Sequence, residues 1–247
     1  MFYWLALLEF VYLYIRSDCM HLTFVTIFPD IYASFLQTSL VKKAQESGII
    51  THDIVNPRDF CSDKHQQVDD EIYGWGAGML MKAQPVIDAV ESVVAKHQLL
   101  GTNSWKVIFL SPSTIVWNQQ LAYDYSHLDH IIFVSGRYEW IDYRFEEYMQ
   151  KTHPDNFSKI SLGQFVTLWW ELPSMVVVES IVRLIPWVIK EEASHLIESY
   201  DPQQSMQNIE YPQYTRPEEV AWIRVPDVLL SWHHAEIEKR RKNNTAN

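Results

Sequence analysis

The chain has 247 residues, 47% of them hydrophobic and 21% charged, which indicates one large globular domain or one domain with a small appendage. Its formal net charge of −11 excludes a general coat protein for nucleic acid, although a local basic face stays open. The two cysteines exclude a disulfide framework and indicate a reduced, cytoplasmic setting.

The first nineteen residues are apolar and aromatic and differ from everything that follows. Glu9 interrupts them, and they are too short to span a bilayer comfortably. They lack the basic segment and the small-residue cleavage site of a signal peptide. We interpret residues 1–19 as an extension that precedes the true start at Met20; a peripheral membrane anchor is the alternative.

From residue 20 onwards, apolar strand patterns alternate with helical patterns, which predicts an α/β domain with a largely parallel sheet. Expected strands cover residues 21–28, 50–55, 106–112, 130–136 and 158–162. Expected helices cover 32–48, 79–98, 171–185 and a segment that begins near Asp142. Ligands bind at the carboxyl ends of such strands, which here are followed by the loops LSPS, SGRYEW and SLGQFVTLWWELP.

The chain changes character beyond Ile185. A polar stretch resembling a linker leads into a short helical C-terminal segment. That segment ends in a basic run, Lys239 to Lys242, which we interpret as a solvated helix end; contact with phosphate is the alternative.

Glycine and tryptophan have unusual counts. Seven glycines make about 3% of the chain against a usual share of about 7%, while ten tryptophans are many for this length. Trp75 lies within GWGAG, where glycines otherwise alternate. No Lys-Ser/Thr pair follows this stretch, so it is not a phosphate-binding P-loop.

Neither the histidines nor the GRYEWID stretch indicates a catalytic or metal site by itself. The pairs His127/His130 and His233/His234 lack partners at ligand spacing, so we expect surface or helix-start histidines and no metal centre. In GRYEWID, Arg137 and Glu139 predict a structural salt-bridge cluster in preference to a catalytic one.

Eight motifs nevertheless occur together in the order and spacing of one family. They are NPRDF, D-D-x-x-Y-G-x-G-x-G-M-L-M, LSP, GRYE-x-ID, S-x-G-x-F-V before ELP, EAS, YPQYTRPE and VPDVLLS-x-x-HAEI. From residue 20 to 247 the chain resembles the bacterial tRNA (guanine-N1)-methyltransferases. The resemblance implies methyl transfer from S-adenosyl-L-methionine to N1 of the tRNA guanosine immediately 3′ of the anticodon, position 37.

The resemblance also implies an architecture. Residues 20–189 would form a SPOUT-type α/β domain with a deep trefoil knot that binds S-adenosyl-L-methionine. Residues 190–210 would be a linker, and residues 211–247 a small α-helical domain that binds tRNA. The family implies a homodimer whose active sites lie at the subunit interface, with no membrane association.

The catalytic residues implied by the resemblance are Glu198, Arg183 and Glu139. Guanine N1 must lose its proton before it attacks a methyl group, which calls for a general base and for stabilisation of charge on O6. Glu198 takes the base position, where relatives often have Asp, and Arg183 the position near O6. Without the family, we would interpret Arg183 as a surface ion pair with Glu179. Glu139 is the third residue, and Mg²⁺ stays open as a second cofactor.

The cofactor and tRNA sites follow from the same motifs. The resemblance assigns to the cofactor Leu110, Ser111, Pro112, Gly136, Tyr138, Leu162, Gly163, Gln164, Phe165, Val166, Thr167, Trp169, Trp170 and Pro173. Asp59 and Asp69 are candidates for the guanosine pocket, with turn caps as the alternative. Tyr214 and Arg216 are candidate tRNA contacts, with Arg216 alternatively capping the linker.

Tryptophan stands where family members carry glycine at seven positions: Trp75, Trp140, Trp169, Trp170, Trp187, Trp222 and Trp232. Random mutation would not replace glycine so selectively, whereas a UGA codon read as glycine in the host would. We expect the indoles of Trp169 and Trp170 to project into the cofactor crevice. Trp117, in contrast, falls at a position that suits a large apolar residue. If the tryptophans are genuine, the alternative is a catalytically impaired, RNA-binding relative.

Overall fold

The computed structural model describes residues 19–74, 76–99, 104–113, 115–189, 199–200 and 209–244. Residues 1–18, Trp75, Glu198 and most of the expected linker therefore lie outside the described residues. The described residues group into two compact units, divided between residues 189 and 190. None of the described helices is both long and apolar enough to cross a membrane.

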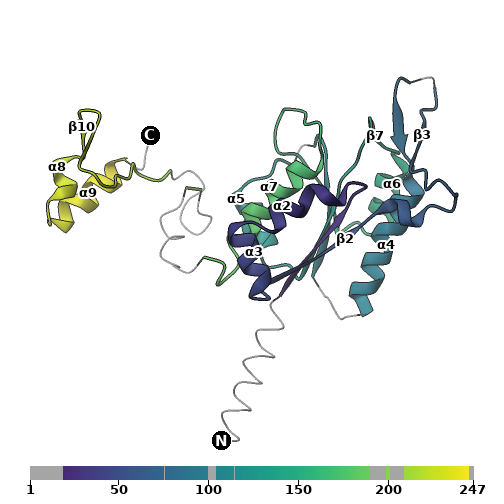
Figure 1. The fold of residues 1–247 in the computed structure, drawn as a ribbon, viewed down its shortest axis with the longest axis horizontal. Coiled ribbons are helices and arrows are strands. Elements are labelled where there is room, and N and C mark those ends of the chain that lie inside the picture. Colours follow the sequence, from purple (N-terminus) through teal and green to yellow (C-terminus); the bar gives the residue numbers. More distant parts are fainter. Residues whose placement is uncertain are drawn as a thin grey trace, which may run out of the picture. The chain divides into compact units, whose positions relative to one another are not determined.

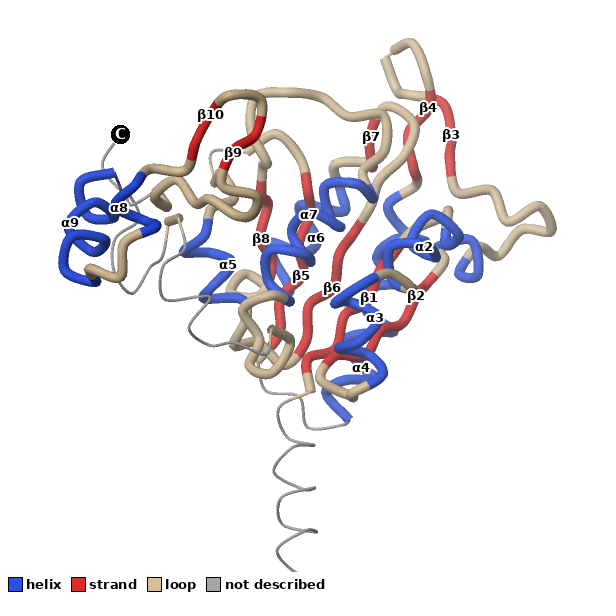
Figure 2. The backbone as a smooth tube through the Cα atoms, turned by 60° about the vertical axis from the view of Figure 1, so that its left-hand side comes forward, coloured by secondary structure: helices blue, strands red, loops and turns tan. Residues whose placement is uncertain are grey.

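A five-stranded parallel sheet forms the centre of the first unit, as the sequence predicts. Its order is β2-β1-β6-β5-β8, seen side by side in Figure 2. The strands are β1 (Met20–Val25), β2 (Ile50–Val55), β5 (Trp105–Leu110), β6 (His130–Val134) and β8 (Phe157–Ile160). All four pairings are parallel. The apolar runs at 106–112 and 130–136 thus become two central strands, buried on both faces.

Helices cover both faces of this sheet (Figure 1). One face packs against η1 (Pro29–Tyr32), α2 (Ala33–Leu36), α3 (Ser39–Glu46), α5 (Gln119–Tyr125) and α7 (Glu171–Val182). The other packs against α4 (Ala83–Leu99) and α6 (Arg144–Thr152). Side chains of β6 alternate between the two cores: Ile131 and Phe133 enter the first, Ile132 and Val134 the second.

A smaller sheet stands beside the carboxyl ends of the main strands. It has the order β3-β4-β7, from β3 (Asp69–Glu71), β4 (Met79–Met81) and β7 (Trp140–Ile141). The predicted helix 79–98 is therefore wrong at its start, because Met79–Met81 pairs with both neighbours and the helix begins at Ala83. The 3-10 turn η2 (Pro57–Phe60) lies in the preceding loop.

Two further sequence predictions are wrong in detail. The helix predicted for residues 32–48 breaks at Thr38, which has extended backbone (φ −115°, ψ 140°) and donates from its hydroxyl to Ser34 O at 2.5 Å. His130, predicted at the surface, is completely buried because it opens the central strand β6. His127, His233 and His234 are exposed.

The second unit contains helices and a short hairpin. α8 (Asp227–Leu230) and α9 (His234–Asn244) follow the antiparallel strands β9 (Glu219–Val220) and β10 (Ile223–Arg224). The sequence predicted the helices but not the hairpin. Ala221 and Trp222 form its turn with φ values of 49° and 59°, the conformation that favours Asn-Gly. Without glycine at either position, the usual sequence signal for such a hairpin is absent.

Candidate functional site

A cavity of about 130 Å³ opens where the carboxyl ends of β5 and β8 meet, at the edge where ligands bind in parallel sheets. Ten of the fourteen predicted cofactor residues line it: Leu110, Ser111, Pro112, Leu162, Gly163, Phe165, Val166, Thr167, Trp170 and Pro173. Trp140, Ile160 and Ser161 complete the lining. The sequence reasoning did not assign these three to the cofactor, although Trp140 and Ser161 lie within the quoted motifs GRYE-x-ID and S-x-G-x-F-V.

Backbone hydrogen bonds hold the two loops of the cavity to each other. Ser161 N donates to Ile115 O at 2.9 Å, and Trp117 N donates to Ser161 O at 2.8 Å. The Ser113 hydroxyl donates to Lys159 O at 2.8 Å. Gly163 has φ 143°, a conformation that side chains rarely adopt. The loop after β8 is thus fixed against the loop after β5.

The cavity lining is mainly apolar and offers few side-chain hydrogen bonds. Ser161 Oγ is occupied within its own loop, since it donates to Gly163 O at 3.0 Å and accepts from Gly163 N at 3.1 Å. Ser111 Oγ is buried and has no hydrogen-bond partner among the described residues. A planar apolar ring with a few polar edges suits this lining.

Two indoles occupy one wall of the cavity. Trp140 and Trp170 pack edge to face with ring centroids 4.8 Å apart, and Trp170 also packs on Phe109. A Cβ at Gly136 would lie 2.9 Å from the Trp170 ring, so Gly136 supports this wall without lining the cavity. Typical ligand pockets enclose about 300–1,000 Å³. The cavity is therefore small for a nucleoside, and both indoles lie in its lining.

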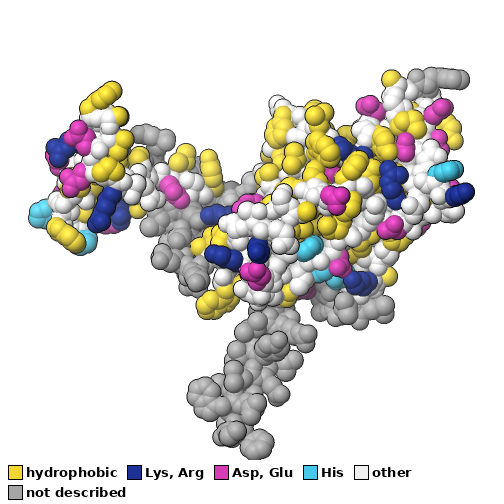
Figure 3. Space-filling view, in the orientation of Figure 1, with side chains coloured by type: hydrophobic (Ala, Val, Ile, Leu, Met, Phe, Trp, Pro, Cys, Tyr) yellow, Lys and Arg dark blue, Asp and Glu magenta, His cyan; other side chains and the backbone are white. Residues whose placement is uncertain are grey.

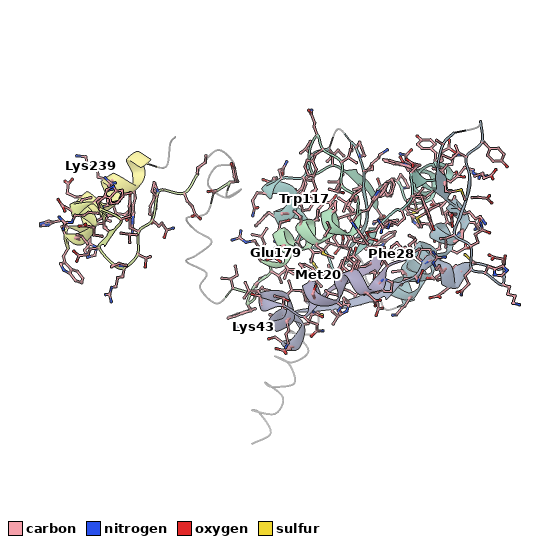
Figure 4. All side chains as sticks on the ribbon, turned by 45° about the horizontal axis from the view of Figure 1, so that its top comes forward. Met20, Phe28, Lys43, Trp117, Glu179 and Lys239 are labelled. Carbon is pink, nitrogen blue, oxygen red and sulfur yellow. The ribbon has the colours of Figure 1, made fainter. Side chains whose placement is uncertain are left out.

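The Trp169 side chain does not line the cavity, contrary to expectation. It contacts Arg137, whose guanidinium lies between the rings of Trp169 (3.9 Å) and Phe28 (4.4 Å) and donates to Leu168 O at 2.9 Å. Phe28, labelled in Figure 4, comes from the loop after β1. The salt-bridge cluster predicted for Arg137 and Glu139 is also wrong, because aromatic faces occupy the guanidinium instead.

The Glu139 side chain is exposed and lies against the glycine-rich loop. A Cβ added at Gly78, whose φ is 90°, would lie 2.5 Å from Glu139 Cγ. Both the conformation and this close approach require glycine at residue 78. Glu139 N donates to Met79 O at 3.1 Å, which couples GRYE to the GMLM motif.

Tyr138 lies beside one of the predicted guanosine residues. Its φ is 59°, and its pKa is raised, first by burial and then by the nearby Asp69 carboxylate, while Arg58 acts in the opposite direction. The structure thus brings Tyr138 and Asp69 together, while their roles in the cofactor and guanosine sites stay predictions. Asp59 lies on η2 and is exposed. Predicted cofactor residue Gln164 is likewise exposed and does not line the cavity.

Arg183 caps the far end of α7. Pro173 lines the cavity near the start of this helix, and Arg183 follows ten residues later, about 15 Å along the axis. Glu198 lies outside the described residues, so its position in the site stays a prediction. In the second unit Tyr214 and Arg216 are exposed.

A buried polar network behind the cavity was not anticipated from the sequence. Glu171 is completely buried at the start of α7 and accepts a hydrogen bond from Thr26 Oγ1 at 2.7 Å. The Tyr32 hydroxyl lies 2.7 Å from Ser174 Oγ, and burial raises the pKa of Tyr32 above its ordinary value. This network fixes the first turn of α7 to the loop after β1. The sequence signal that could have revealed this network is Glu171, an acidic residue at the start of a mainly apolar helix.

Comparison with known proteins gives a consistent result. The family model described as "tRNA (Guanine-1)-methyltransferase TrmD" matches residues 20–247. Proteins named tRNA (guanine-N(1)-)-methyltransferase are similar to this chain in several bacteria. That of Bacillus pumilus is 39% identical over 223 residues, covering 90% of this chain and 86% of the relative. Those of Mycoplasmopsis agalactiae and Borrelia duttonii are 42% and 40% identical, covering 90% of this chain and 90% and 86% of the relatives.

Proposed function

The chain belongs to the tRNA (guanine-1)-methyltransferase family, and we propose that it methylates N1 of guanosine 37 in tRNA, using S-adenosyl-L-methionine. The observation that carries this proposal is the cavity at the carboxyl ends of β5 and β8. Ten residues that the family motifs assign to the cofactor converge there from two separate loops, which follow β5 and β8. The apolar lining and the unpaired hydroxyl of Ser111 suit an adenosine group.

The proposed reaction uses the cofactor and three side chains, the carboxylates of Glu198 and Glu139 and the guanidinium of Arg183. S-adenosyl-L-methionine supplies an electrophilic methyl group when bound. Glu198 removes the N1 proton of guanine, and Arg183 stabilises the charge that develops on O6. We assign to Glu139, which lies against Gly78, the role of assisting a Mg²⁺ ion. Positioning and proton removal suffice for this reaction.

We assign the first unit to the SPOUT type with a deep trefoil knot. The support is the pair of hydrogen bonds by which Ser161 ties the loop after β8 to the loop after β5, since a knot requires these segments to be interlocked. We also propose a cytoplasmic location, which the two free cysteines and a tRNA substrate support.

A homodimer completes the proposed site. Val176 follows Leu172 by about one helical turn and Arg183 follows Leu172 by about three turns. These three residues therefore lie on one face of α7. The side chains of Leu172 and Val176 are 47% and 55% exposed, and Leu168, on the adjoining loop, is 87% exposed. Figure 3 shows hydrophobic side chains gathered over this part of the molecule. A second copy packed on this face would bring its own cavity to Arg183, which lies too far along the helix from the cavity of its own chain.

The seven tryptophans at family glycine positions are, we propose, glycines read from UGA codons. Trp187 and Trp222 have φ values of 72° and 59° and are 82% and 88% exposed, which suits glycine and not tryptophan. Trp117 (Figure 4) behaves differently, since its indole packs on the core and donates to Ser180 Oγ at 2.9 Å. Replacing Trp140 and Trp170 by glycine would also enlarge the cavity.

The decisive experiment compares two synthetic proteins, one with glycine and one with tryptophan at the seven positions. Each is incubated with S-adenosyl-L-methionine and a tRNA transcript that carries G37, and 1-methylguanosine is measured by mass spectrometry of the nucleoside digest. A transcript with A37 is the substrate control. We expect product only with G37 and only from the glycine form. Absence of product from both forms would refute the function; tRNA binding would then indicate the impaired relative.

Subunit mixing tests the interface site. In this and every later activity test the protein carries glycine at the seven positions. In that form, Arg183→Ala and the cavity-filling Ser161→Phe are each expected to be inactive as homodimers. Random mixing gives half heterodimers, each with one intact site if Arg183 acts on the partner's cavity, so roughly a quarter of wild-type activity returns. No recovery from mixed dimers would contradict the shared site. Glu147→Gln, an exposed change on α6, is the control that keeps full activity.

A further inference from the structure

Three histidines from distant parts of the sequence meet at the amino-terminal edge of the main sheet. His21 is the second residue of β1, His130 opens β6, and the two are directly paired in the parallel register. His97 reaches them from the last turn of α4. The ring centroids lie 3.7 Å apart for His97 and His130, 4.5 Å for His21 and His97, and 5.0 Å for His21 and His130. We call this group the histidine triad.

Hydrogen bonds orient two of the rings and leave a nitrogen free on each. His21 Nδ1 lies 2.8 Å from Thr51 Oγ1, and His130 Nε2 lies 2.9 Å from Thr23 Oγ1. The opposite nitrogens, His21 Nε2 and His130 Nδ1, are buried without a hydrogen-bond partner among the described residues, and so is His97 Nε2. These three make up nearly half of the seven such buried atoms in the described structure.

We propose that the triad binds a zinc ion. One ring nitrogen from each histidine can be chosen so that all three lie within 4.8 Å of one another. In a tetrahedral zinc site, Zn–N distances of about 2.0–2.1 Å place the ligand nitrogens about 3.4 Å apart. Rotations of the histidine rings can close the difference from 4.8 Å. Second-shell hydrogen bonds of the kind made by Thr51 and Thr23 are typical of metal-ligating histidines. Water takes the fourth position.

The nearby charges are compatible with a cation. The Asp53 carboxylate oxygen Oδ2 lies 3.5 Å from His21 Nε2 and 2.6 Å from Lys96 Nζ. The carboxylate therefore neutralises the lysine, so that no net positive charge beside the triad opposes a cation. Three packed neutral imidazoles without an ion would leave three buried nitrogens unsatisfied, which is unfavourable.

The zinc site is structural and separate from methyl transfer. The triad lies at the amino ends of β1 and β6, whereas the cavity lies at the carboxyl ends of β5 and β8. An ion there would link the end of α4 to strands β1 and β6 of the sheet. Because zinc would bind the folded protein and not the unfolded chain, its binding would raise the stability of the first unit.

The experiment uses the full chain, treated with chelator and then titrated with Zn²⁺ alone. We expect one zinc per chain by native mass spectrometry, a rise in melting temperature, and visible absorption typical of tetrahedral Co²⁺ after cobalt replacement. His97→Gln should weaken zinc binding at least about 100-fold, because even second-shell changes cost about 10–100-fold. His97 is the preferred site because it lies on a helix end and not within the sheet.

His127→Gln, at an exposed histidine outside the triad, is the matched control and should bind zinc as the unmodified protein does. His21→Gln provides a second ligand variant if His97→Gln does not fold. Methyl transfer should continue in the zinc-free protein at temperatures where it remains folded. A chain that takes up no stoichiometric zinc, or zinc binding unaffected by both ligand variants, overturns the proposal. Binding of Ni²⁺ or Cu²⁺ without Zn²⁺ overturns the choice of metal.

Discussion

Replacing Trp187 by glycine should stabilise the protein. Trp187 follows α7 in a turn, with φ 72° and 82% of its surface exposed. The left-handed conformation costs a residue with a side chain about 1–2 kcal/mol, which glycine does not incur. Glycine loses more backbone entropy on folding, about 0.5–1 kcal/mol. Because so little of the indole is buried, the net effect is a gain of up to about 1 kcal/mol.

Trp187→Ala separates backbone strain from the loss of the indole. Alanine keeps the strain at positive φ, so this variant should be less stable than Trp187→Gly by up to about 1 kcal/mol. Trp117→Gly is the opposite control, because its indole packs on the core and donates to Ser180. Removing it should cost about 3–5 kcal/mol.

Urea unfolding and calorimetry of the four proteins measure these differences. One kcal/mol corresponds to a shift in melting temperature of about 2–4 °C for a chain of this size. If Trp187→Gly is less stable than Trp187→Ala, the backbone at residue 187 does not require glycine. The structural support for a recoded glycine at that position would then be lost.

Three further predictions concern the site and the buried polar groups. Gly78→Ala should lower methyl transfer about 10–100-fold by displacing Glu139, whereas Gly48→Ala, with similar positive φ but no atom within 4 Å, should lower stability alone. Thr26→Val should cost about 1–3 kcal/mol of unfolding free energy by leaving buried Glu171 short of a donor, and Thr26→Ser should not. Burial lowers the pKa of each triad imidazole, so the unfolded chain binds protons below pH 6.5 that the folded chain does not. Metal-free protein should therefore lose stability as the pH falls from 6.5, and a flat profile between pH 7 and 5 would contradict this.

The sequence determined the α/β class and the edge of the sheet that carries the cavity. Continuous apolar runs such as those ending at Leu110 and Val134 suit only strands buried on both faces, so a parallel sheet followed. The loops after parallel strands necessarily meet at one edge, which is why the motif residues of the loops after β5 and β8 converge on one cavity.

Local patterns did not decide where the helices begin or where the histidines lie. The hydroxyl of Thr38 and the pairing of Met79–Met81 with two strands override helical periodicity. The sheet register places His21 opposite His130, and the length of α4 brings His97 to them. These residues are 76 and 33 positions apart in the sequence. No short-range pattern encodes such contacts, because they depend on strand register and helix packing, which only the tertiary structure fixes.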